Sequence, residues 1–461
     1  MDKRPPKKPM MKPSVIDARR LALNALMDVT RADAYATLAL DKHLSRSNLS
    51  HVDKRLATNI FYSALENRIR ISHVLGQFVS KMPEPVIEDI LHIAAAQLLF
   101  MDKLPDHAVV DQAVRQVKTL GREHYAALVN GTLRSLIRAR DAGEIEYPDK
   151  EKYPLRYLSI MHSLPEPLVK RIADDYGMDQ AQEILRYRPE SFDQTIRPNF
   201  RRYDAQAFEA YAEKRHWTLK PGVVPMAYHL SGAADLGQDE DFLAGRYSMI
   251  GESSMLAAYA VAPKGSEVIL DACAAPGGKA AMMAEMLTDG GRVQAWDVHE
   301  HRVQLLKSVQ KRLHLENMKP AVRDASIHSP NLDMMFDAVL IDAPCSGLGV
   351  MLNKPDIKYR VSSQDIDSLV KLQKKILDAC CQYVGIGGRL IYSTCTITKD
   401  ENERQVRAFL DSHPEFSLDE SGDWLPESLR DRMQDGMLQL QPHLDHMDGF
   451  FIARMVRRGA L

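Results

Sequence analysis

The 461-residue chain has no apolar run long enough to cross a membrane. A transmembrane helix needs about 20 consecutive apolar residues, and no stretch of about 18 occurs. The N-terminus, MDKRPPKKPMMKPS, has basic residues and prolines where a secretory signal has an apolar core. We therefore expect a cytoplasmic protein that neither spans a membrane nor is secreted.

Cysteine is scarce, and its spacing excludes two common uses. The five cysteines all lie in the second half, their number is odd, and no CxxC pair occurs. This pattern argues against a disulfide framework and against a zinc knuckle, so we expect no metal site. Any functional cysteine should act as a thiol. The cysteines are Cys273, Cys345, Cys380, Cys381 and Cys395.

Positive and negative charges are nearly equal in number over the whole chain, but they are unevenly distributed along it. The net charge is −2, yet residues 1–140 contain 22 Lys and Arg against 14 Asp and Glu. The front of the chain therefore has a surplus of eight positive charges, and the remainder is acidic. Such a surplus suits a phosphate-rich partner, although a solvated helical surface can have the same balance.

The hydrophobic fraction of 45% is ordinary for a folded protein, and the length suggests roughly three domains. The basic, proline-rich residues 1–13 are expected to be disordered. Residues 14–140 repeat apolar side chains at helical spacing, beginning with Ala18, Leu21 and Ala25, which predicts a helical domain. After a polar, proline-containing break, residues 155–245 are expected to form a small α+β domain, and residues 246–461 the last domain.

In this last segment, short β-branched or apolar runs alternate with helical stretches. Strand–helix alternation of this length predicts an α/β fold with a doubly wound, mostly parallel sheet, whose ligand lies at the carboxyl ends of the strands. Helices are expected near 278–288, 299–313, 364–383 and 400–411. The expected strands are Glu267–Ala272, Arg292–Asp297, Phe336–Ala343, Gly388–Thr394 and Gly449–Met455.

A glycine-containing loop follows the first of these strands and opens a helix. Paired glycines let the backbone approach a ligand closely, and a helix N-terminus offers free amides to an anionic group. A Walker A loop would need Gly at 273 and Ser or Thr at 280, but Cys273 and Ala280 stand there, and no GxGxxG is present. An ordinary glycine turn remains the alternative. The loop consists of Cys273, Ala274, Ala275, Pro276, Gly277, Gly278 and Lys279.

Two aspartates follow the next strands at positions that suit a nucleoside. Asp297 ends the second strand, where a carboxylate can accept hydrogen bonds from ribose hydroxyls. Asp324 is expected to follow a third strand, a position from which its carboxylate can contact an adenine edge. Either aspartate could instead cap a helix.

Thiols and a carboxylate follow the remaining two strands. Asp342 and Cys345 come after one strand, and Cys395 ends the next, so all three should face one crevice. Cys380 and Cys381 lie within a helical run and are expected to be buried. A nucleophilic thiol needs a positive or hydrogen-bonding neighbour, for which Lys279, Lys358 and nearby backbone amides are candidates.

These motifs resemble those of the RNA (cytosine-C5)-methyltransferases: DACAAPGGKA (271–280), DAPCSGLG (342–349) and YSTCT (392–396). The resemblance extends to 355–358, 401–403 and 448–451. The first 140 residues resemble the helical NusB RNA-binding domain through DKRLA (53–57), LPDHAVV (104–110) and VNGTLR (129–134). Together they are similar to the Sun/Fmu type of bacterial 16S ribosomal RNA methyltransferase.

The resemblance implies a Rossmann-like methyltransferase domain that uses S-adenosylmethionine. It implies that Cys395 attacks C6 of a cytosine, that Asp342 supplies or stabilises a proton at N3, and that Cys345 assists release. The implied cofactor-binding residues are the loop 273–279 together with Asp297, Asp324 and Asp342.

Two other functions stay open at this point. One is the same chemistry on transfer RNA, and the other is a non-catalytic RNA-binding assembly factor with a degenerate methyltransferase fold. For the favoured interpretation we expect 16S ribosomal RNA as the partner, no DNA, no membrane and a monomeric protein.

Overall fold

The computed structural model describes residues 17–102, 104–189, 194–231 and 236–459. The expected disordered tail, residues 1–13, lies outside them. Two compact units are formed. The helical unit contains the chain up to Lys170 together with Lys354–Arg360, and the sheet unit contains Arg171–Asn353 and Val361–Leu461.

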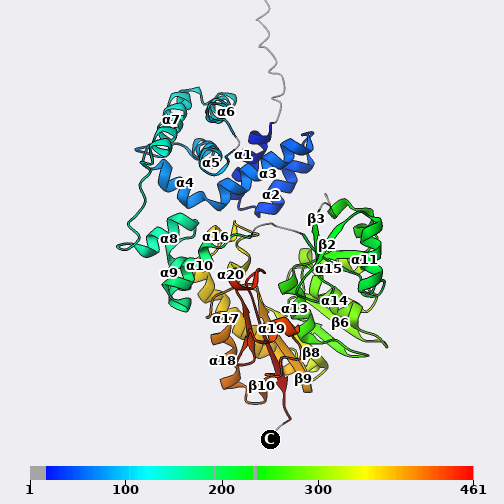
Figure 1. Ribbon diagram of the computed structural model, residues 1–461. Helices are drawn as coiled ribbons and strands as arrows, with labels where there is room; N and C mark the ends of the chain where they lie inside the picture. The colour runs from blue at the N-terminus through cyan, green and yellow to red at the C-terminus, as the bar shows by residue number, and fades with distance from the viewer. Residues whose placement is uncertain (1–16, 103, 190–193, 232–235, 460–461) are drawn as a thin grey trace, which may run out of the picture. The chain divides into compact units, whose positions relative to one another are not determined.

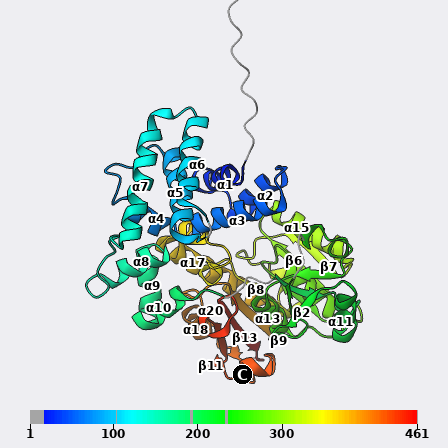
Figure 2. The same ribbon diagram turned by 45° about the horizontal axis from the view of Figure 1, so that its top comes forward.

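The helical unit is built around α5 (Pro85–Phe100), which is apolar on nearly every side. A helix of this kind must be enclosed by others, and α5 contacts α1, α3, α4, α6 and α7 (Figure 2). The neighbouring elements are α1 (Ala18–Ala32), α2 (Ala36–Ser45), α3 (His51–Glu66), α4 (Arg68–Leu75), α6 (Asp106–Thr119), η1 (Glu123–Tyr125), α7 (Ala126–Ala142), α8 (Pro154–His162), and α9 (Glu166–Tyr176), which continues into the sheet unit.

One short segment of the helical unit comes from much later in the chain. Residues Lys354–Arg360, which include α16 (Ile357–Arg360), pack with the N-terminal helices. The carboxylate of Asp356 accepts a hydrogen bond from the Ala36 amide at the start of α2, whose own N-cap residue makes no side-chain bond. The Arg360 guanidinium lies over the ring of Tyr35. The segment therefore caps and covers a helix encoded about 320 residues earlier.

The sheet unit begins with a small α+β part. Its four strands have the order β2-β3-β1-β4, and every pairing is antiparallel. A buried ion pair joins this part to the larger sheet's helices, since Arg197 of β1 bonds Glu285 of α14 at 2.6 Å. The elements are α10 (Met178–Arg186), β1 (Gln194–Pro198), α11 (Ala205–Lys214), β2 (Thr218–Pro221), β3 (Tyr228–Ser231), η2 (Leu236–Gln238), α12 (Glu240–Leu243) and β4 (Tyr247–Met249).

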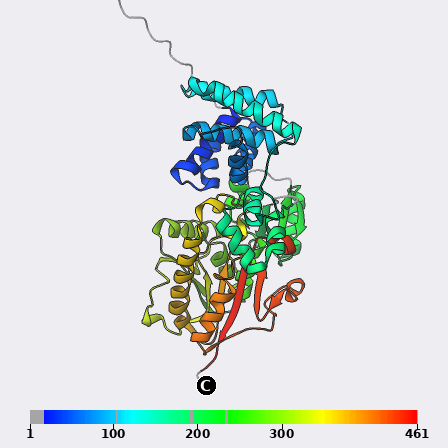
Figure 3. The same cartoon turned by 90° about the vertical axis from the view of Figure 1, so that its left-hand side faces the viewer.

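Within the described residues the larger sheet has nine strands, in the order β11-β12-β13-β9-β8-β5-β6-β7 with β10 beside β13. The strands β5 to β9 run parallel, and the C-terminal strands are antiparallel, red in Figure 3. The bounds are β5 (Val268–Asp271), β6 (Arg292–Asp297), β7 (Met318–Val322), β8 (Phe336–Asp342), β9 (Val384–Thr394), β10 (Phe416–Leu418), β11 (Met433–Gln434), β12 (Met437–Leu440) and β13 (Phe450–Arg457).

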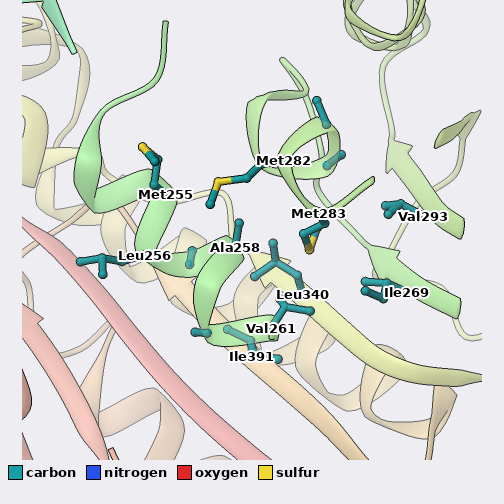
Figure 4. Close-up of a cluster of buried hydrophobic side chains, with 14 of the residues drawn as sticks. Met255, Leu256, Ala258, Val261, Ile269, Met282, Met283, Val293, Leu340 and Ile391 are labelled. Carbon is teal, nitrogen blue, oxygen red and sulfur yellow. The ribbon is translucent and has the colours of Figure 1, made fainter. Parts of the chain in front are cut away.

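Helices cover both faces of this sheet. On one face, side chains of α13, α14 and α15 form a single apolar cluster with the strands, part of which Figure 4 shows. On the other face, α17 and α18 pack against the sheet (Figure 1). The remaining elements are α13 (Glu252–Val261), α14 (Gly278–Met286), α15 (Glu300–Leu313), η3 (Pro330–Leu332), η4 (Leu348–Val350), α17 (Ser363–Cys380), η5 (Cys381–Tyr383), α18 (Glu403–Ser412), α19 (Glu427–Arg430) and α20 (Pro442–Asp445).

The strand order confirms the expected doubly wound sheet. From β5 the chain moves to β6 and β7 on one side, and to β8 and β9 on the other, so the order reverses between β5 and β8. Ligands of such sheets bind at this point of reversal, beyond the carboxyl ends of the strands. No helix in the described ranges is long and apolar enough to span a bilayer.

Candidate active site

The loop between β5 and α14 requires glycine for a steric reason. Gly277 has a φ of 115°, in the left-handed region, and a Cβ there would lie 3.1 Å from the Leu306 side chain. Gly278 then begins α14, which has no side-chain cap, and the first amides of a helix have no partner within the helix itself. The expected glycine loop is therefore present at the point where the strand order reverses.

Asp271, the last residue of β5, was not predicted from the sequence. Its carboxylate is almost fully buried, and neither oxygen has a hydrogen-bond partner among the described residues. Burial and the nearby charge of Asp342 raise the pKa of Asp271 to about 8, and the charge of Lys279 only partly opposes this shift. A buried acidic group without a partner suits a site that receives a cationic ligand.

The two nucleoside-oriented aspartates have different surroundings. Asp297 is buried at the end of β6, where it accepts a bond from the His299 amide and pairs with Arg302 at 3.1 Å. Arg302 also donates to the Ala275 carbonyl, so it ties Asp297 to the glycine loop. Asp324 is exposed after β7 and accepts bonds from Ser326. Both aspartates lie at the carboxyl ends of strands, as expected.

Asp342 ends β8 next to the reversal point. Its carboxylate accepts bonds from the Lys279 ammonium at 2.7 Å and from the Ser393 hydroxyl at 3.0 Å. Burial by itself would lower the pKa of Lys279, but the charge and hydrogen bond of Asp342 outweigh it and raise this pKa. The charge of Cys395 also acts on Lys279, so the ammonium lies near both groups.

Two of the five thiols come together. The Sγ atoms of Cys345, in the loop after β8, and of Cys395, after β9, are 3.2 Å apart. The hydrogen bond to Cys395 and burial raise the pKa of Cys345 well above its usual value. The expected burial of Cys380 and Cys381 beneath the other face is confirmed.

The backbones of the two cysteine loops are also in contact. The Gly349 amide donates to the Cys395 carbonyl at 3.1 Å, and the Gly449 amide donates to the Gly349 carbonyl. A Cβ at Gly349 would lie 2.0 Å from the Gly449 oxygen. Only glycine fits between these backbones, which keeps the two loops close.

The suggestion that Lys358 activates a thiol was wrong. Its side chain is buried in the helical unit, where the ammonium donates to the carbonyls of His162 and Glu66. Lys358 and both of these acceptors belong to the helical unit. Lys279 is the lysine that the fold brings to the cysteines.

Within the described residues no group of three or more His, Cys, Asp or Glu could hold a metal ion. The site therefore offers a glycine loop, acidic side chains at successive strand ends, one ammonium and two adjacent thiols. This donor set can bind a small cationic nucleoside and perform thiol chemistry on a base.

Comparison with solved structures shows a shared fold. A methyltransferase homolog from Pyrococcus horikoshii superimposes with a TM-score of 0.56 at 24% identity, covering 66% of this chain and 99% of that one. This likeness extends over about two thirds of the chain and shows that the two proteins share a fold.

Comparison with protein families identifies the group to which the chain belongs. The model for the 16S rRNA methyltransferase RsmB/F matches residues 258–456, and the model for the NusB family matches residues 16–138. The probable ribosomal RNA small subunit methyltransferase B of Bacillus subtilis is 36% identical over 98% of this chain and its whole length. The corresponding Synechocystis protein is 31% identical over 96% of this chain and 99% of its own. The chain belongs to the RsmB/F family of 16S rRNA methyltransferases.

These findings confirm the resemblance drawn from the motifs. The chain is an S-adenosylmethionine-dependent methyltransferase with a NusB-like helical region. The residues at the strand ends fit this cofactor, because the cofactor is cationic and the buried carboxylate of Asp271 has no partner among the described residues. The glycine loop provides the close backbone approach that a nucleoside ligand needs.

Proposed function

We propose that the chain transfers a methyl group to C5 of a cytosine in 16S ribosomal RNA through a covalent bond between Cys395 and C6. The observation that carries this proposal is the 3.2 Å separation of the Cys345 and Cys395 sulfur atoms, beside the carboxylate of Asp342. The family and the names of its relatives support ribosomal RNA as the substrate.

S-adenosylmethionine, when bound, supplies an electrophilic methyl group. We assign its binding to the loop 273–279, with Asp297 accepting from the ribose, Asp324 facing the adenine and Asp342 closing the site. Asp271 joins this group because its buried carboxylate can face a positive charge. Arg302 orients Asp297 and the loop rather than touching the cofactor.

The pyrimidine must first be activated, because C5 of cytosine is a weak nucleophile. The Cys395 thiolate adds to C6, and the electron pair of the C5–C6 double bond moves toward N3, where Asp342 supplies or stabilises a proton. The Lys279 ammonium donates to Asp342 and so holds its carboxyl group in place. The resulting enamine has a nucleophilic C5 carbon, which the free base lacks.

Cys345 then completes the reaction. The hydrogen bond of Cys395, burial and the charge of Cys395 raise the pKa of Cys345 and keep it protonated while Cys395 is a thiolate. Once the Cys395 sulfur is bonded to carbon it is neutral, so the contribution of its charge is lost and Cys345 loses its proton to solvent more readily. The Cys345 thiolate can then accept the C5 proton, and Cys395 leaves C6.

The RNA must also be held, and the target base must leave its stack at a cost of a few kcal/mol. We propose that residues 14–140 form the RNA-binding domain, that 155–245 link it, and that 246–461 are the methyltransferase domain. The surplus of eight positive charges in residues 1–140, four of them within residues 14–140 and four in residues 1–13, supports this assignment. We further propose that the enzyme is a monomer that acts in the cytoplasm, where ribosomal RNA is methylated, and does not act on DNA.

Mass spectrometry of RNA tests the substrate. Cells that lack the protein should lose one 5-methylcytosine from 16S ribosomal RNA, and the wild-type gene should restore it, whereas a gene encoding Cys395→Ala should not. Loss of the modified base from transfer RNA instead would overturn the ribosomal assignment. Restoration by Cys395→Ala would overturn the proposed chemistry.

A further inference from the structure

Glu401 lies two residues before α18 and is fully buried. One carboxylate oxygen accepts the Ser346 amide at 2.8 Å and the Gln373 side chain at 3.1 Å, and the other accepts the hydroxyls of Ser346 and Thr398, both at 2.6 Å. Ser346 is the residue after Cys345. Four donors thus converge on one carboxylate, and two of them belong to a residue bonded to a reactive cysteine.

Asn402, the next residue, makes similar contacts to the residues that flank the other cysteine, Cys395. Its side-chain oxygen accepts the Thr394 hydroxyl at 2.5 Å, and its amide donates to the Thr396 carbonyl at 3.1 Å. Thr394 and Thr396 are the residues on either side of Cys395. Asn402 is almost fully buried, so water does not compete for these bonds.

A hydroxyl pair joins the two sets. The Ser346 and Thr396 oxygens are 2.7 Å apart. Because a carboxylate only accepts, the Ser346 hydroxyl donates to Glu401 and therefore accepts a hydrogen bond from the Thr396 hydroxyl. The order Thr396, Ser346, Glu401 gives these hydrogen bonds one direction across the two cysteine loops.

We infer that Glu401 and Asn402 are positioning residues that divide the catalytic cysteines between them, Glu401 fixing Cys345 and Asn402 fixing Cys395. The inference rests on the proposed function, since it assigns each residue to one step of that chemistry. Asn402 then serves the attack on C6, and Glu401 serves the removal of the C5 proton and the release of Cys395.

The division has a kinetic consequence. A displacement of about 1 Å at a reacting group can cost on the order of 100-fold in rate. Loosening Cys345 should slow release more than attack, so the covalent complex with RNA should accumulate. Loosening Cys395 should slow the attack itself, so little complex should form. A merely structural role would reduce both steps together.

The test compares Glu401→Ala and Asn402→Ala in the full-length enzyme with 16S ribosomal RNA and S-adenosylmethionine. For Glu401→Ala we expect steady-state turnover to fall at least about tenfold. The single-turnover methylation rate should change less, and an RNA-bound band should survive denaturing electrophoresis. For Asn402→Ala we expect the single-turnover rate to fall by a similar factor with no such band.

Glu403→Gln is the matched control, because Glu403 follows in the same run but pairs with Arg407 at the surface. It should behave as wild type. Glu401→Gln keeps the shape and one acceptor oxygen for the Ser346 amide, so it should recover much of the turnover. If the melting temperature of Glu401→Ala falls well below that of wild type, Glu401→Gln becomes the deciding variant. It should then show the RNA-bound band in denaturing electrophoresis, more weakly than Glu401→Ala.

An unchanged turnover in both Glu401 variants would overturn the inference, and so would an equal loss of both steps in Glu401→Ala and Asn402→Ala. Cys345→Ala and Cys395→Ala are run beside them. If Cys345→Ala gives no covalent complex, the proposed function itself fails. If the cysteine variants behave as proposed while the Glu401 variants do not, only this inference fails.

Discussion

Asp271→Asn should stabilise the ligand-free enzyme and at the same time weaken cofactor binding. The carboxyl has an ordinary pKa of 3.8, but burial and the charge of Asp342 raise it to about 8 in the folded protein. Between these pH values the folded state holds a proton that the unfolded state has lost. Its contribution to stability is therefore complete below pH 3.8 and is lost progressively as the pH rises toward 8.

The size of the effect follows from the pH difference. A pH of 7 is about three units above the pKa of this carboxyl in the unfolded state, and each unit corresponds to about 1.4 kcal/mol. The wild-type protein therefore loses about 4 kcal/mol of stability between low pH and pH 7. Asparagine does not ionise and avoids this loss. We expect the melting temperature of the variant to exceed that of wild type by on the order of 10 °C at pH 7, and by less at pH 5.

Cofactor binding should respond in the opposite direction. A cationic ligand favours the ionised carboxylate, so the wild-type affinity for S-adenosylmethionine should rise about tenfold per pH unit from pH 6 toward 8. Asp271→Asn should bind more weakly and lose this pH dependence.

Differential scanning calorimetry at pH 5, 6, 7 and 8 and titration calorimetry with S-adenosylmethionine measure both effects. Asp297→Asn is the control, since that buried carboxylate already pairs with Arg302 and should give no stabilisation. A lower melting temperature for Asp271→Asn at pH 7 would refute the reasoning.

Three further outcomes are expected. Arg197→Met should destabilise the sheet unit by about 3–5 kcal/mol in urea unfolding, because Glu285 would be left buried and unpaired; a loss below 1 kcal/mol would contradict this. Asp356→Ala should lower the stability of the helical unit by about 1 kcal/mol through loss of the α2 cap, measured by its thermal melt. Replacing Arg134 and Arg138 of α7 by Gln should reduce the salt slope of RNA binding by about 2, since both are exposed and their partners among the described residues are the neutral Asn130 and Ser135; an unchanged slope would exclude this face.

Substitution is preferable to deletion of residues 1–140 in that last experiment. The Tyr359 side chain packs in the core of the helical unit, and Asp356 caps α2. Deleting the N-terminal helices would remove the partners of both residues, so a loss of activity would not report on RNA contacts alone.

The parallel strands were predictable because runs of apolar residues mark them in the sequence. The functional residues were predictable because they directly follow these runs. The apolar runs that end in Asp297, Asp342 and Thr394 become β6, β8 and β9, and the residues after them meet at one edge of the sheet. The family motifs then identified the thiols that come together, Cys345 and Cys395.

Other features depend on contacts that no local pattern encodes. Lys358 was a candidate neighbour of the thiols, but its burial in the helical unit is decided by residues some 200 to 290 positions away. The short C-terminal strands β10 to β12 are two to four residues long, too short for a periodic pattern to emerge. Residues 401–403 entered the sequence analysis only as part of a resemblance. Glu401 and Asn402 contact different cysteine loops, and no sequence pattern encodes those contacts.

The assignment of two different roles to the two thiols is the central claim, and trapping of the covalent complex tests it most directly. Purified Cys345→Ala, incubated with 16S ribosomal RNA and S-adenosylmethionine, should retain a bond to RNA that survives boiling in detergent. Cys395→Ala and the double variant should give no such complex. A complex formed by Cys395→Ala and not by Cys345→Ala would contradict the account.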